Sequence, residues 1–386
     1  MKNNVSIIKD CYGCGVCTKA CSKKLIHMKL DAKGFYKPII ENPEKCTECM
    51  LCLDVCACNN HGLSFNGNPL VTMSTWSNDS YTRENCSSGG VGYEIAKALI
   101  DRGYKVTAVR YNVDKKRAEH YIAHNITELQ ASKGSKYLQS FTEDCWSEIN
   151  RNDKFLIIGT PCQIDSMRRY TQKMKCEENF IFMDFFCHGV PSYLMWNVYL
   201  NFQQSKLGKI SKVAWRNKKY GWHDSWCMTI SNTEGETILS RLSGSDMFYR
   251  MFLGDFCCNV ACQKHCKYKY LSSAADIRIG DCWGRTFQKN DEGVSSLVAF
   301  SEKGKSIIDS LDEQVTKRYY PMDIVAEYQM RKNAGNAYLS KIAWKMLLSH
   351  KGYKEATWDT LVKVEAMLHL PVKVFNKICK ILKGKN

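Results

Sequence analysis

The chain has 386 residues, which is enough for two or three domains, and 44% of them are hydrophobic, which supports buried cores. Its formal net charge of +16 would suggest a nucleic-acid partner, but the basic residues are scattered and do not form a stripe. No stretch approaches the ~20 apolar residues of a membrane-spanning helix. We therefore expect a cytoplasmic protein that does not bind nucleic acid. The chain has 21 cysteines, which is far more than an ordinary cytosolic protein contains.

Two cysteine-rich runs near the start, CYGCGVCTKAC and CTECMLCLDVC, share the spacing C-x2-C-x2-C-x3-C. This is the spacing of bacterial ferredoxins, in which three cysteines of one run and the fourth of the other hold each 4Fe–4S cluster. Zinc sites pair two ligands from each of two distant segments, and disulfides are not expected because we find no signal peptide. We expect two 4Fe–4S clusters, one on Cys11, Cys14, Cys17 and Cys56, and its twin on Cys46, Cys49, Cys52 and Cys21.

With the clusters bound, the net charge is lower than the formal value, since an oxidised cluster with its four thiolates carries about −2. Between the two runs, residues 25–40 alternate in polarity around a turn and predict a β-hairpin, and residues 63–65 are expected to complete its small sheet. We expect this ferredoxin domain to span residues 1–68, followed by a polar linker over residues 69–86.

A domain of alternating strands and helices is predicted over residues 87–300. It begins with the small-residue loop Ser87–Gly90, a helix that stops at Gly103, and a strand over residues 105–112. Such a loop at a helix start can bind an anion through free amides, or it can be an ordinary helix cap. The basic turn around Lys136 in KGSKYLQS is by itself a surface loop.

Two apolar strands in this domain, 155–158 and 180–186, are each followed by a tight loop and a helix. This pattern predicts parallel strands that are buried on both faces, with ligands beyond their carboxyl ends. Cys162 and Cys187 both lie there, either as ligands of one shared site or as core residues.

Further along, Arg216, Lys218 and Trp222 could bind an anionic aromatic ligand or form an aromatic strand surface. A third metal centre is the simplest reason for five cysteines to crowd into one short segment: Cys257, Cys258, Cys262, Cys266 and Cys282. Residues 301–386 predict a helical region with a basic amphipathic end, which either contacts an anionic membrane or partner or packs on its own domain.

The order of the motifs CSSGG, KGSKYLQS, GTPCQIDSMRR, DFFCHGVPS, WRNKKYGW and AADIRIGDCWG resembles the coenzyme F420 hydrogenase/dehydrogenase beta-subunit family over residues 5–300. The resemblance implies FAD in the α/β domain and a third 4Fe–4S cluster nearby, on Cys162, Cys187, Cys262 and Cys266, with Cys258 and Cys282 in reserve because the family spacing is C-x2-C. For flavin contacts it implies Ser88, Gly89, Gly90, Lys136, Gln139, Thr160, Pro161 and Gln163.

The fold class expected is therefore α+β and α/β: a dicluster ferredoxin domain, an α/β flavin-binding domain and a helical C-terminal region. The resemblance implies an enzyme that moves electrons from a ferredoxin-type donor through the clusters to FAD and on to a hydride acceptor, which is F420-like or a conjugated substrate of surface-polysaccharide synthesis. Expected partners are a ferredoxin or a hydrogenase or dehydrogenase subunit, and the alternative is a non-catalytic electron-transfer subunit. No catalytic residue is assigned beyond a candidate, His188, whose alternative is a packing role.

Overall fold

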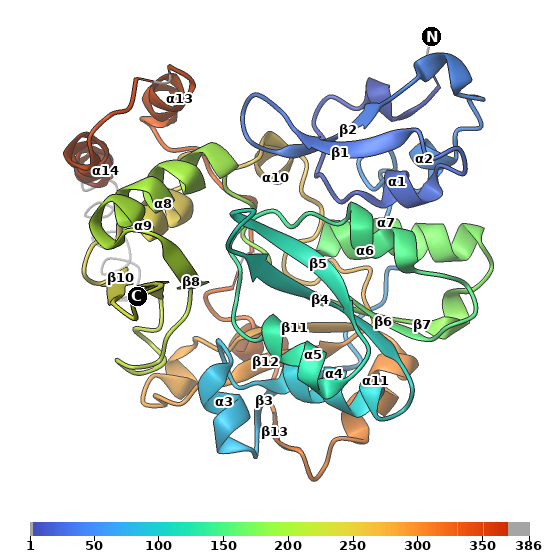
Figure 1. Ribbon diagram of the computed structural model, residues 1–386. Coiled ribbons are helices and arrows are strands. Elements are labelled where there is room, and N and C mark those ends of the chain that lie inside the picture. The colour runs from blue at the N-terminus through green and yellow to red at the C-terminus, as the bar shows by residue number, and fades with distance from the viewer. Residues whose placement is uncertain (1–2, 330, 350, 370–386) are drawn as a thin grey trace, which may run out of the picture.

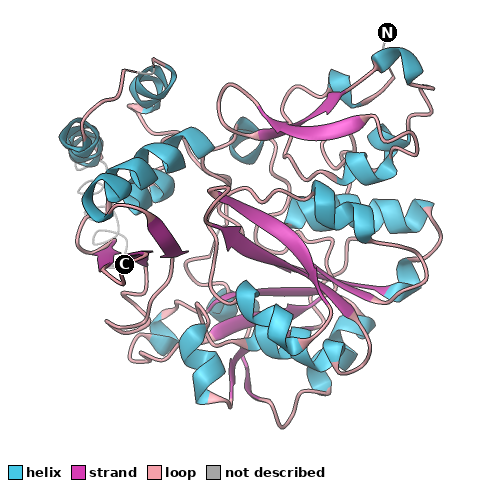
Figure 2. Cartoon of the chain, in the orientation of Figure 1, coloured by secondary structure: helices cyan, strands magenta, loops and turns pink. Residues whose placement is uncertain are grey.

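The computed structural model describes residues 3–329, 331–349 and 351–369. Its largest feature is an eight-stranded mixed sheet with the order β13-β3-β12-β11-β7-β6-β4-β5 (Figures 1 and 2). The four inner strands β11, β7, β6 and β4 run parallel, and the strands on either side pair antiparallel. The strands of this sheet are β3 (Val71–Ser77), β4 (Lys105–Asn112), β5 (Arg117–Ala123), β6 (Phe155–Ile158), β7 (Phe180–Phe185), β11 (Ile277–Asp281), β12 (Ser295–Ala299) and β13 (Val315–Tyr319).

Both faces of the sheet are covered because successive side chains of its inner strands point to opposite sides. Leu156 and Ile181 pack on one face with helices α4 (Val91–Ile100) and α11 (Glu302–Asp309). Phe155 and Phe180 pack on the other face with α6 (Glu143–Glu148) and α7 (Pro161–Lys173). On that second face the N-terminal domain lies over α6 and α7 (Figure 1).

The N-terminal domain is small and contains one two-stranded sheet among its described residues. The expected hairpin is formed by β1 (Ile26–Leu30) and β2 (Tyr36–Ile40), and short helices follow the cysteine loops, α1 (Val16–Ala20) and α2 (Leu51–Asp54). Residues 63–65, which we expected to extend this sheet, form no strand.

A third layer stands beside the large sheet. Its sheet pairs β8 (Ile210–Ala214), β9 (Cys227–Asn232) and β10 (Thr237–Arg241). An aromatic core that includes Trp196, Trp215 and Phe248 joins this layer to neighbouring helices. The remaining helices are α3 (Ser80–Asn85), α5 (Ile126–Leu129), α8 (Tyr193–Leu207), α9 (Met247–Leu253), α10 (Val260–Lys264), α12 (Met322–Val325), α13 (Ser340–Leu348) and α14 (Glu355–Leu368).

Two expected boundaries differ from the structure. Residues 69–86 contain β3 and α3 in place of a linker, and β3 lies inside the large sheet between β13 and β12. The region 301–386 is not purely helical, because β13 adds an edge strand to the same sheet. The basic amphipathic end, residues 371–386, lies outside the described residues. Within the described part of the chain, no helix is both long and apolar enough to cross a membrane.

Candidate metal centres

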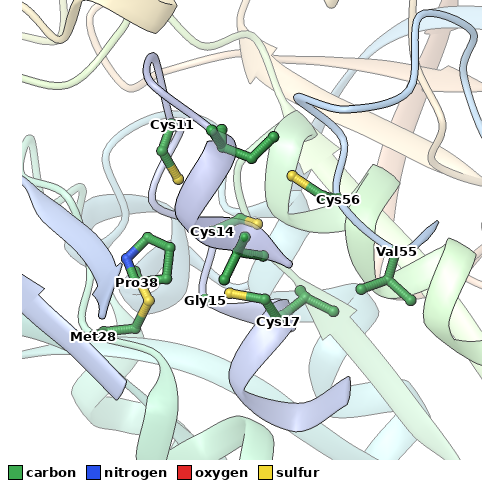
Figure 3. Close-up of a pocket in the computed structure, with 11 residues that line it drawn as sticks. Cys11, Cys14, Gly15, Cys17, Met28, Pro38, Val55 and Cys56 are labelled. Carbon is green, nitrogen blue, oxygen red and sulfur yellow. The ribbon is translucent and has the colours of Figure 1, made fainter. Parts of the chain in front are cut away.

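The first three cysteines of run one share a pocket with the last cysteine of run two. Cys11, Cys14, Cys17 and Cys56 line this space together, and their sulfur atoms turn toward its middle (Figure 3). The loop can wrap the pocket because Gly13 and Gly15 take φ values of +73° and +76°, which strain other residues. This grouping is the interleaved one that we expected from ferredoxin spacing.

A second pocket is lined by the remaining four cysteines of the two runs. Cys21, Cys46, Cys49 and Cys52 line it, again with three thiols from one run and one from the other. Cys49 is exposed, whereas Cys11, Cys14 and Cys17 are all buried. The second set therefore lies nearer the surface than the first.

The electrostatics of the first pocket suit a cationic metal centre. Burial, followed by the charges of Cys56 and Cys11, raises the pKa of Cys14 to about 12. Burial and neighbouring thiolates also raise the pKa of Cys17 well above its ordinary value. Thiolates packed this closely are stable only with compensating positive charge, which iron supplies when these sulfurs ligate it.

A third set of four cysteines forms at the carboxyl ends of the parallel strands β6 and β7. Cys162 lies in the first turn of α7, where its Sγ is 3.2 Å from Oγ1 of the N-cap Thr160, and Cys187 follows β7. Cys262 lies in α10 and Cys266 follows it. These segments meet because Asn259 N–H of the α10 segment donates to Val190 O of the loop after β7 at 3.0 Å.

The four thiols of this third set interact with one another. Burial raises the pKa of Cys162, and the charges of Cys14, Cys262 and Cys187 raise it further. Burial, then the charges of Cys187 and Cys266, raise the pKa of Cys262 to about 12. Four thiols from separate segments of the chain therefore gather here.

One cation that the sequence did not reveal lies next to this set. Lys269 donates from Nζ to the carbonyl oxygens of Cys187 and His188 at 2.6 and 3.0 Å. Burial raises the pKa of Cys187 to about 11, and the Lys269 charge opposes that rise. A lysine three residues after a cysteine carries no motif, so only the fold could identify it.

The first and third sets are neighbours in space, since Sγ of Cys14 donates to Oγ of Ser166 at 3.3 Å, and Ser166 lies in α7 one turn after Cys162. Between them lies Tyr12, whose pKa is raised by burial and then by Cys58, Cys162, Cys266 and Cys262. Its ring packs edge-on against Tyr268 with ring centroids 5.9 Å apart. The first and second sets lie in the N-terminal domain, and the first lies next to the third. The three sets are thus arranged in series.

The remaining cysteines of the crowded segment take other places. Cys257 is buried in the aromatic core, and Cys282 packs with Trp222 and Phe287. Cys258 lies close to the third set, because the charge of Cys262 contributes to raising its pKa after burial and the Asp255 carboxylate. Of the two reserve cysteines, only Cys258 is near the predicted centre.

The glycine loop expected at the flavin begins α4. Gly90 caps the helix with φ +86°, and a Cβ atom on Gly89 would come within 2.5 Å of Thr75 O. Ser88 Oγ donates to Val294 O at 2.7 Å. The loop is tied to the basic turn, because Ser135 N–H donates to Ser87 Oγ at 2.8 Å.

Basic side chains converge on this loop. Arg216 donates to Ser87 O at 2.9 Å and pairs with Asp281, and Lys218 donates to Ser88 O at 2.6 Å. Burial raises the pKa of Cys86, beside the loop, to about 11, against the charges of Lys133, Lys218 and Lys136. Several basic side chains therefore surround the start of α4, whose first turn also contains the buried carboxylate of Glu94.

Two further residues expected at the flavin, Lys136 and Gln139, bond to backbone groups. Lys136 donates to four carbonyl oxygens of residues 131–134, and burial lowers its pKa to about 7. Gln139 accepts from Tyr36 N–H at 2.6 Å and donates to Tyr12 O at 3.0 Å, which ties the α/β domain to the N-terminal one.

Thr160, Pro161 and Gln163, which were also expected at the flavin, lie at the start of α7. Thr160 and Gln163 make a capping box, and Pro161 occupies its first turn. This turn carries Cys162, so these residues position the third cysteine set.

Comparisons with known protein families match two separate parts of the chain. Residues 10–60 match the family model described as a 4Fe-4S dicluster domain. Residues 152–321 match the model that describes the carboxyl-terminal part of the coenzyme F420 hydrogenase/dehydrogenase beta subunit. A search of curated proteins finds no match.

Among solved structures, a chain of the F420-reducing [NiFe] hydrogenase complex from Methanosarcina barkeri, determined with xenon, is similar. It has 15% sequence identity and a TM-score of 0.49, over 73% of this chain and 90% of that one. The two family matches together show the organisation of the protein. The chain therefore carries a 4Fe–4S dicluster domain in its N-terminal part, followed by a segment, residues 152–321, that matches the carboxyl-terminal part of the coenzyme F420 hydrogenase/dehydrogenase beta-subunit family.

Proposed function

We propose that this protein is an iron–sulfur flavoprotein oxidoreductase. It accepts single electrons from a ferredoxin-type donor or a partner redox subunit and delivers them in pairs, through 4Fe–4S centres and FAD, to a hydride acceptor. The acceptor is F420-like or another conjugated molecule, including one used in surface-polysaccharide synthesis. The site of action is the cytoplasm, with or without contact to the membrane surface through the basic C-terminal end.

The observation that carries the proposal is the closeness of the first cysteine set to α7, the helix that carries Cys162, since Cys14 Sγ donates to Ser166 Oγ at 3.3 Å. The charge of Cys14, in the N-terminal domain, acts on Cys162 at the sheet edge. Asn259 strengthens this junction, since its side chain donates to Cys11 O at 3.2 Å. A third iron–sulfur centre on Cys162, Cys187, Cys262 and Cys266 would continue the series of the first two into the α/β domain.

The residues at the start of α4 fit the diphosphate of FAD. The loop Ser88–Gly90 offers the amino end of a ten-residue helix, and Lys133 and Lys218 bring positive charge to it. Gly134 faces open space, because a Cβ atom there would meet nothing within 4 Å. Bound FAD supplies the exchange between single electrons and a hydride equivalent.

The other expected residues act through their neighbours. Lys136 orders the basic turn, Gln139 holds the two domains together, and Thr160, Pro161 and Gln163 fix the turn that carries Cys162. Nε2 of His188 lies 2.7 Å from Oδ1 of Asp255 beside the third set, and we assign this residue no catalytic step.

The direct experiment is anaerobic purification followed by counts of iron, acid-labile sulfide and flavin. We expect about twelve iron atoms and about one FAD per chain. A Lys218→Met variant should lose flavin and keep its iron. About eight iron atoms in wild-type protein would contradict the third centre, and absence of flavin after incubation with FAD would contradict the flavoprotein assignment.

A second candidate is a non-catalytic electron-transfer subunit. One observation favours it: the cations near α4 are already engaged, Arg216 by Asp281 and Lys218 by the carbonyls of Arg83, Ser88 and Glu292. The test is reduction of F420 and other conjugated acceptors with a reduced ferredoxin as donor. Turnover only after a partner subunit is added would favour this candidate.

A further inference from the structure

Three potential metal ligands of different chemistry meet beside the third cysteine set. Nε2 of His188 lies 2.7 Å from Oδ1 of Asp255, and the same oxygen lies 3.9 Å from Sγ of Cys258. All three ligand atoms lie within 4.8 Å of one another. Cys258 is buried, and the side chains of His188 and Asp255 are only 15% and 19% exposed.

The backbone holds these side chains in place from two segments. The loop after β7 pairs with the start of the α10 segment through a bridge between Pro191 and Cys258. Asp255 takes φ +59°, a conformation that non-glycine residues adopt at a cost and that clusters at functional sites. Its Oδ2 accepts from Gly335 N–H at 2.6 Å, so Oδ1 is the oxygen that faces His188 and Cys258.

We propose that His188, Asp255 and Cys258 bind one divalent metal ion, of which Zn²⁺ fits best, separate from the iron–sulfur centres. An imidazole, a carboxylate and a thiolate are the three ligand types that zinc takes in proteins. A carboxylate and a thiolate together balance the charge of a divalent ion, which removes the cost of burying them uncompensated.

The geometry is close to that of a zinc site. Tetrahedral bonds of about 2.0–2.3 Å separate ligand atoms by roughly 3.3–3.5 Å. The nitrogen–oxygen separation of 2.7 Å must open by about 0.6 Å, and the oxygen–sulfur separation of 3.9 Å must close by about 0.4 Å. Three protein ligands leave the fourth position to water. The ion would fasten the loop that carries Cys187 to the segments at residues 255 and 335.

The test uses full-length protein, purified anaerobically from cells grown with added zinc, and measures metal content and zinc K-edge absorption. We expect about one zinc per chain, with one sulfur and several nitrogen or oxygen neighbours. Cys258→Ala should lower zinc at least about fivefold and leave iron unchanged. Cys257→Ala is the matched control, because that neighbouring thiol is equally buried in the aromatic core, and it should keep its zinc.

Asp255→Asn provides a second variant, since it keeps the size of the side chain and removes the charge. It should also lose zinc while iron stays constant. Wild-type protein without stoichiometric zinc would overturn the proposal, as would zinc surrounded by four sulfurs, which would place it in a cysteine set. A loss of iron from Cys258→Ala would overturn it too, because Cys258 would then be a cluster ligand.

Discussion

The pair formed by Arg278 and Asp184 offers a quantitative test of how the third cysteine set is held. Both side chains are fully buried, and two donors of the guanidinium contact the two carboxylate oxygens at 2.7 and 2.6 Å. Arg278 also donates to the carbonyls of Tyr270 and Ser272, in the segment that follows Cys266. Breaking this pair should therefore disturb both the core and the third set.

Arg278→Met leaves the carboxylate buried without its cation, which typically costs about 3–5 kcal/mol of unfolding free energy. With an unfolding entropy near 2 cal/mol/K per residue, a chain of 386 residues should melt about 4–6 °C lower. Asp184→Leu should cost a similar amount. The double variant should recover much of the loss, because no buried charge remains unpaired.

The assay is anaerobic thermal unfolding followed by circular dichroism, with iron content measured on the same samples. Arg285→Met is the control, since that side chain is 82% exposed and its loss should change stability by less than about 0.5 kcal/mol. Additive effects of the two single changes would refute the reasoning, because they would mean that Arg278 and Asp184 do not depend on each other.

Three further predictions concern the centres and their surroundings. Gly13→Ala should abolish the first centre or the domain junction, because its Cβ would overlap with Nε2 of Gln139. Gly103→Ala is the control: that glycine has a similar φ, its Cβ would meet nothing within 4 Å, and the variant should keep all of its iron. Lys269→Met should lower the reduction potential of the third centre in an EPR redox titration, since it removes a neighbouring positive charge; an unchanged potential would contradict this. Burial lowers the pKa of His120 to about 4. As pH falls from about 6.5 to 4, the unfolded chain therefore takes up a proton at this residue that the folded chain does not, and the free energy of unfolding decreases. His120→Asn should flatten that part of the stability profile, and an equally steep profile would contradict the assignment.

The features that sequence predicted well are those encoded by short-range patterns. The cysteine spacing predicted that Cys56 joins Cys11, and alternating polarity over residues 25–40 predicted the hairpin that β1 and β2 form. The period of apolar residues also placed the strand 105–112 correctly. In each of these cases, the local pattern and the tertiary contacts agree.

The features that sequence missed depend on packing between distant segments. Strand β3 reads VTMSTWS, and its buried Ser74 and Thr75 look like linker residues until the neighbouring strands β12 and β13 pair with them. Gln139 looked like a flavin contact because its loop is a family motif, yet its amide binds the N-terminal domain. No pattern around Lys269 indicates that it touches Cys187. These contacts exist only once distant segments of the chain have packed together.

The most direct test of the account follows electrons through the chain in wild-type protein and in Cys162→Ser. Both proteins, loaded with iron, sulfide and FAD, are mixed anaerobically with reduced ferredoxin, and cluster and flavin absorbance are recorded over time. We predict that the two N-terminal centres are reduced at the same rate in both, and that flavin is reduced quickly only in wild-type protein. Equally fast flavin reduction in Cys162→Ser would contradict a path through the third cysteine set.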